Sequence, residues 1–258
     1  MWVDLVEGFL TQGNLVFIAL ALFLLMVLAL ESGAAAQRRF APAARDGEHS
    51  EGLLLSAALA LLGLLIAFTF SLAISRYDAR RAMVVTEANA IGTAWLRAGL
   101  TGGPGNPDLQ QAITQYTDVR LGLSEGRSAA SVERETTGAQ ASVWAALERT
   151  IPKAPPALVN SLVTSVNEMF DAASARKAER DAKIPAHVLE LLVLYTIMSA
   201  GIVGYVMNAS GRRHLAVTTI LFGLLALAIT LILDLDRPRR GSILVSQQPM
   251  IDVRASMH

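Results

Sequence analysis

Four long apolar stretches dominate the chain, at residues 15–30, 52–74, 185–207 and 215–233. The first is apolar at every position, and the second is interrupted only by Ser56, Thr69 and Ser71. A helix needs about 20 largely apolar residues to cross a bilayer. Because backbone polar groups in lipid must be satisfied within the segment, these stretches are predicted to be helices rather than strands.

Between the second and third stretches the chain is polar but keeps a helical pattern. No proline occurs from about 53 to about 100, so one helix is expected to leave the bilayer near Ser75 and continue beyond it. Breakers at 101–107, Gly126 and 151–156 separate three further helices, at 108–123, 128–149 and 157–183. The fold class is therefore all-α integral membrane, with four transmembrane helices and a helical soluble region inserted between the second and third.

This pattern divides the chain into five parts. Residues 1–14 are expected to lie at the membrane interface as a short amphipathic helix, with a frayed terminus as the alternative. Residues 15–75 hold transmembrane helices 1 and 2, residues 76–184 the soluble region, and residues 185–234 transmembrane helices 3 and 4. Residues 235–258 form a C-terminal tail, and its apolar residues between 241 and 250 predict packing on protein, with a neighbouring subunit as the expected support.

The composition argues against several kinds of metal, cofactor and catalytic site. The sequence has no cysteine, which excludes disulfides, thiolate metal ligands and a cysteine nucleophile. The 4 histidines are scattered without ligand spacing, so we expect no metal or other cofactor. No hydrolase elbow, phosphate-binding loop, zinc-protease or dinucleotide motif occurs, so we do not expect an enzyme. We expect no nucleic-acid partner.

Basic residues indicate the orientation in the membrane. Arginine and lysine gather beside the spans at 76–81, 176–183 and 237–240, on the side that carries both tails and the soluble region. The positive-inside rule therefore places the soluble region and both termini in the cytoplasm. The acidic residues before the first span favour the opposite orientation of that helix, which keeps the alternative open.

Two neighbouring stripes follow the second span. One consists of small residues (Ser56, Ala60, Gly63, Ala67, Ser71 and Ser75), and the other of bulky ones (Leu62, Ile66, Phe70 and Ile74). Small stripes usually mark close packing between membrane helices. The alternative is a helix that lines a pore, with Ile66, Phe70, Ser71 and Ile74 at an apolar neck that stops ions by dewetting.

Ionisable residues cluster beyond the second and fourth spans. Asp234 and Asp236 lie at the end of a helix, where carboxylates oppose the helix dipole. We therefore expect ion pairs with Arg76, Arg80 or Arg81 at the mouth of the second span, where Asp78 also lies. Within the soluble region, Glu87, Asn89, Arg97, Tyr116 and Arg120 predict a polar network. A satisfied interhelical network is the simpler interpretation, and a binding or gating site is the alternative.

The segments 68–81, 87–97 and 234–241, with 247–250, resemble the bestrophin-like family of bacterial four-span membrane proteins. More distantly, the layout is similar to that of bestrophin channels, which are pentamers whose second span lines a hydrophobic neck. The resemblance implies a homo-oligomer, such as a pentamer, in the bacterial inner membrane. Its partners would be the lipid bilayer, further copies of the chain and inorganic ions.

The resemblance leaves two functions to weigh. The first is an oligomeric ion channel that passes anions such as chloride through a pore lined by the second transmembrane helix. The alternative is a non-conducting membrane scaffold or sensor whose helical region binds a protein partner. An intramembrane enzyme has no motif in its favour.

Overall fold

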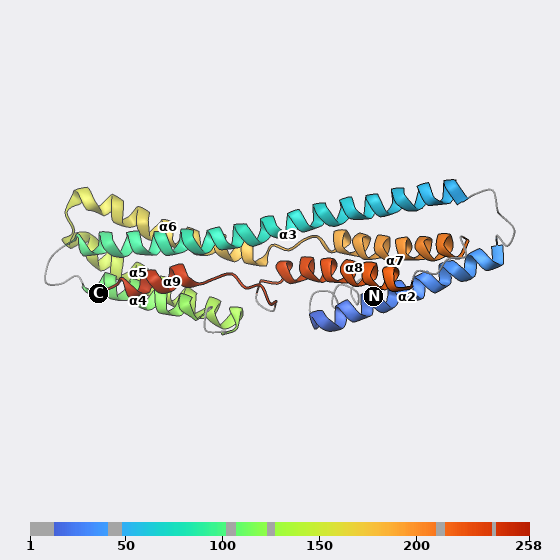
Figure 1. Ribbon diagram of the computed structural model, residues 1–258. Helices are drawn as coiled ribbons and strands as arrows, with labels where there is room; N and C mark the ends of the chain where they lie inside the picture. The colour runs from blue at the N-terminus through green and yellow to red at the C-terminus, as the bar shows by residue number, and fades with distance from the viewer. Residues whose placement is uncertain (1–12, 41–47, 102–106, 123–126, 210–214, 239–240) are drawn as a thin grey trace. The chain divides into compact units, whose positions relative to one another are not determined.

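The computed structural model describes residues 13–40, 48–101, 107–122, 127–209, 215–238 and 241–258 (Figure 1). Nearly all of these residues are helical, and none of them is in a strand, which confirms the predicted all-α class. The predicted interfacial segment 1–14 lies almost entirely outside the described residues. The elements are α2 (Leu15–Phe40), α3 (Glu48–Gly99), α4 (Pro107–Leu121), α5 (Ala129–Thr150), the 3-10 turn η1 (Ile151–Lys153), α6 (Pro156–Asp181), α7 (Ala186–Ala209), α8 (Leu215–Asp236) and α9 (Gln248–Ala255).

The four predicted spans are confirmed. Four helices of the described chain are long and apolar enough to cross a membrane, with their apolar parts in α2, α3, α7 and α8. Large side chains on these helices are exposed, among them Leu24 at 58% and Leu227 at 64%. Exposed leucines are what a surface in contact with lipid requires.

The chain forms two compact units. The membrane unit consists of Met1–Tyr77 and Lys183–Leu244, and the soluble unit of Asp78–Ala182 and Val245–His258. Helix α3 is 52 residues long and contributes to both, without a break (Figure 1). The predicted soluble region, 76–184, corresponds to the first segment of the soluble unit, to which the end of the tail is added.

In the membrane unit, α2 and α7 pack with their backbones almost in contact. A Cβ atom at Gly33 would lie 1.9 Å from the Gly201 carbonyl oxygen, and one at Gly204 would lie 1.9 Å from the Leu30 carbonyl oxygen. Membrane helices associate largely through van der Waals packing, so small residues at the interface allow the close approach that stabilises the pair.

In the soluble unit, part of α3 packs with α4, α5 and α6 around a core that includes Ile91, Ile113, Leu147 and Met169. The tail joins the same core, because Met250 is 0% exposed and belongs to it. The tail therefore packs on protein as predicted, but it is the soluble unit of its own chain that buries Met250. Helix α9, which the sequence did not predict, forms this attachment.

Candidate functional site

The bulky stripe of α3 turns gradually from the interior of the membrane unit towards its surface. Leu62 is 1% exposed, Ile66 and Phe70 are half-buried against the core of this unit, and Ile74 is 38% exposed. Ser71 is exposed. The six members of the small stripe, from Ser56 to Ser75, are all exposed in the single chain. The assignment of Ile66, Phe70, Ser71 and Ile74 to a neck stays a prediction.

Arg80 stabilises the end of α6 in the soluble unit. Its side chain is buried, and its Nη2 and Nε donate to the carbonyl oxygens of Ala182 at 3.1 Å and Glu179 at 3.4 Å. A cation at a helix C-terminus satisfies the last carbonyls and interacts favourably with the helix dipole. Asp78 and Arg81 are exposed, and Arg76 is half-buried.

The two aspartates at the end of α8 are buried and accept hydrogen bonds from backbone amides. Asp234 Oδ1 accepts from Ser242 N at 2.7 Å, and Asp236 Oδ1 accepts from Ile184 N at 3.0 Å. Gly241 is required here, because a Cβ atom at this position would lie 2.1 Å from Asp234 Oδ1. The aspartates thus hold two chain segments in place, and their ion pairs with arginine stay a prediction.

The soluble unit contains a fully buried carboxylate between two arginines. Arg120 donates to Glu87 through Nε at 2.5 Å and Nη2 at 3.2 Å, and Arg176 Nη1 donates to Glu87 at 2.6 Å. Burial alone would raise the pKa of Glu87, but Arg120 and then Arg176 outweigh it, so its pKa lies below the ordinary value. Glu87 therefore stays ionised at neutral pH.

Tyr116 lies beside this carboxylate in the same core. It is 0% exposed, and the centroid of its ring lies 5.9 Å from that of Phe170. Burial, followed by the negative charge of Glu87, raises the pKa of the Tyr116 hydroxyl well above its ordinary value. The phenol therefore stays neutral beside the ion pairs of Glu87.

The structure brings Glu87, Tyr116 and Arg120 together, but not the other two residues of the predicted network. Asn89 is exposed, and Arg97 Nη1 donates to the carbonyl oxygen of Ser161 at 3.2 Å. Two partners were missed, since Arg176 binds both Glu87 and the side-chain oxygen of Gln247. Arg176 ends the buried stripe of α6 that includes Met169 and Ala173, and this spacing could have indicated it; no local pattern indicates Gln247.

The comparisons with known proteins agree with this arrangement. The model of the Bestrophin-like domain matches residues 17–250. No curated protein sequence shows significant similarity. Crystal structures of bacterial bestrophin homologues from Klebsiella pneumoniae, each with a single substitution, superpose with TM-scores of 0.64 and 0.65 at 13% and 10% identity. Each comparison covers 94% of this chain and 97% of the other.

A further crystal structure, described as a membrane protein, gives a TM-score of 0.64 at 11% identity and covers 95% of this chain and 97% of the other. At these identities the solved structures establish the fold alone. The family model spans most of the sequence, and the chain therefore belongs to the Bestrophin-like family.

Proposed function

We propose that this protein is an oligomeric ion channel that passes anions such as chloride through a pore lined by α3. The observation that carries the proposal is the course of the bulky stripe on α3. A side chain that lines a pore must rest on its own subunit and remain open on the opposite side. Ile66 and Phe70 are half-buried against the membrane unit and Ile74 is partly exposed, which is the burial this role requires.

The length of α3 supports the same role. One helix of 52 residues carries the apolar stripe and then contributes buried residues such as Ile91 to the soluble unit. Residues of the stripe recur every four positions, so one continuous helix holds them on one face. A ring of such apolar side chains around an axis can stop ions by excluding water.

The small stripe supports assembly into an oligomer. The six residues of this stripe are exposed in the single chain, and small side chains permit close contact between membrane helices. Further copies of the chain are the partners that fit, and the resemblance to bestrophin channels favours a pentamer. Chloride flux from liposomes tests the function, because the alternative, a non-conducting scaffold or sensor, predicts none.

We also propose that the protein lies in the bacterial inner membrane with its soluble unit and both termini in the cytoplasm, on the basis of the basic residues beside the spans. The chain has no cysteine, so single cysteines can report the orientation. Ser142→Cys, at an exposed position of α5, is expected to resist a membrane-impermeant thiol reagent in intact cells. Phe40→Cys, at the opposite end of α2, is the matched control and is expected to react. Labelling of position 142 together with protection of position 40 would show that the protein has the opposite orientation.

A further inference from the structure

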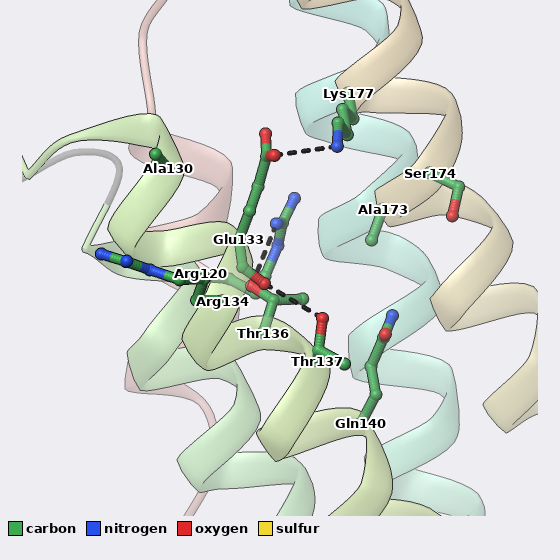
Figure 2. Close-up of a pocket in the computed structure, with 10 residues that line it drawn as sticks. All are labelled: Arg120, Ala130, Glu133, Arg134, Thr136, Thr137, Gln140, Ala173, Ser174 and Lys177. Carbon is green, nitrogen blue, oxygen red and sulfur yellow. Dashed lines mark hydrogen bonds and ion pairs between the residues drawn. The ribbon is translucent and has the colours of Figure 1, made fainter.

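A groove lies between α5 and α6 in the soluble unit, and Figure 2 shows the side chains around it. Its volume is about 550 Å³, and it is widely open to solvent. Glu133, Arg134 and Gln140 come from α5, and Lys177 comes from α6. Arg120 of α4, the partner of Glu87, also contributes to the lining.

Positive charge exceeds negative charge around this groove. Three cationic side chains line it, namely Arg120, Arg134 and Lys177, against the single carboxylate of Glu133. Glu133 is already shared, because it binds Lys177 at 2.8 Å and also Arg180. When the ion-pair partners are included, the cations Arg120, Arg134, Arg176, Lys177 and Arg180 face the carboxylates of Glu87, Glu133 and Asp181.

One nitrogen of the Arg120 guanidinium, Nη1, makes only a long hydrogen bond beside the groove. Its Nε and Nη2 bind Glu87, whereas the contact of Nη1 with Thr136 Oγ1 is long, at 3.5 Å. The residue is 3% exposed. Good N–H···O hydrogen bonds measure about 2.7–3.2 Å, so a better acceptor in the groove would bind this buried guanidinium more strongly than Thr136 does.

The other lining residues are neutral, and they include polar side chains as well as two alanines. Thr137 and Ser174 contribute hydroxyl groups, and Gln140 contributes an amide that can both donate and accept. These groups suit a ligand that carries hydroxyl groups in addition to its charge. The groove is also far larger than a single halide ion requires.

We propose that this groove binds a small organic anion with at least two negative charges and with hydroxyl groups, such as a hydroxycarboxylate or a sugar phosphate. Arg120 provides a planar donor that matches carboxylate and phosphate oxygens, and Lys177 adds a second cation. Arg134 lies at the edge of the groove, with its side chain directed away from Lys177 (Figure 2). The proposal does not depend on conduction, so its test reads binding rather than flux.

The test is calorimetric titration of the full-length protein in detergent at constant ionic strength. The probes are citrate and glucose 6-phosphate, which distinguish the two kinds of anion, with glucose as the neutral control. At least one anion is expected to bind saturably, and glucose is not. The double variant Arg134→Gln, Lys177→Gln is expected to weaken binding at least tenfold, a loss that corresponds to about 1.4 kcal/mol.

The matched control is the double variant Arg149→Gln, Lys153→Gln, which removes the same charge from exposed positions of the soluble unit outside the groove. It is expected to bind the anion as the unmodified protein does. Both pairs lie at exposed positions, and the ion pair of Lys177 with Glu133 is partly exposed, so neither variant should unfold. Absence of saturable binding by both anions, or equal weakening in the two double variants, would overturn the proposal.

Discussion

Replacing Glu87 with glutamine is expected to destabilise the soluble unit by about 3–5 kcal/mol, the usual cost of removing one partner of a buried ion pair. Arg120 and Arg176 are 3% and 7% exposed, and both donate to this carboxylate. A glutamine side chain has nearly the same shape but no charge. Two buried guanidinium groups would then lie side by side without their shared counter-ion.

Urea unfolding followed by the fluorescence of Trp95 and Trp144 measures this loss. Asp118→Asn is the control, because it removes the exposed ion pair with Arg254 and should cost less than about 1 kcal/mol. Equal losses in the two variants would show that Glu87 is not a central support of the unit.

The same carboxylate predicts a dependence on acid. Because the pKa of Glu87 is lowered by folding, its contribution to stability is complete above the ordinary glutamate value of about 4.3 and is lost as the pH falls through the folded value. The unmodified protein should therefore lose stability below about pH 4, and Glu87→Gln should lose less over the same range. An identical pH profile in both proteins would contradict this assignment.

Replacing Gly204 with alanine is expected to separate α2 from α7 and to destabilise the membrane unit. The added Cβ would lie 1.9 Å from the carbonyl oxygen and 2.8 Å from the Cα of Leu30. These are backbone atoms of a helix and cannot rotate away, as a side chain could. Overpacking typically costs about 1–3 kcal/mol, and we expect the upper end of this range because a whole helix must shift.

Thermal unfolding in detergent measures the effect, as a clear fall in Tm. The control is Gly223→Ala on α8, where a Cβ would meet nothing within 4 Å. Ala also favours a helix over Gly, so the control should leave Tm unchanged or raise it. A Tm for Gly204→Ala equal to that of the control would show that the two helices have room to separate at little cost.

The helices and the four spans could be predicted from the sequence because they depend on local properties. Apolar length sets a span, and Pro and Gly mark helix ends. The sequence therefore anticipated that a single helix, α3, runs on without a break, within a few residues of its bounds at Glu48–Gly99. The short helix α9 was missed because its eight residues are too few to display a period.

Partners distant in the chain were harder to predict. The sequence shows that Asp234 and Asp236 need donors, but it does not show whether arginines or backbone amides provide them. The structure supplies the amides of Ser242 and Ile184, which no local pattern indicates. Gln247 likewise meets Arg176 only because the tail folds back into the soluble core.

The central claim is that α3 lines an ion-conducting pore, and the most direct test is chloride flux from liposomes containing Phe70→Ala. Phe70 is half-buried, so its truncation should widen an apolar neck on the axis. Leu62→Ala is the matched control, because Leu62 belongs to the same stripe but is 1% exposed and lies within its own core. The account predicts an intact oligomer in which Phe70→Ala raises chloride flux above that of the unmodified protein, while Leu62→Ala does not. An intact Phe70→Ala oligomer that passes no chloride would contradict it.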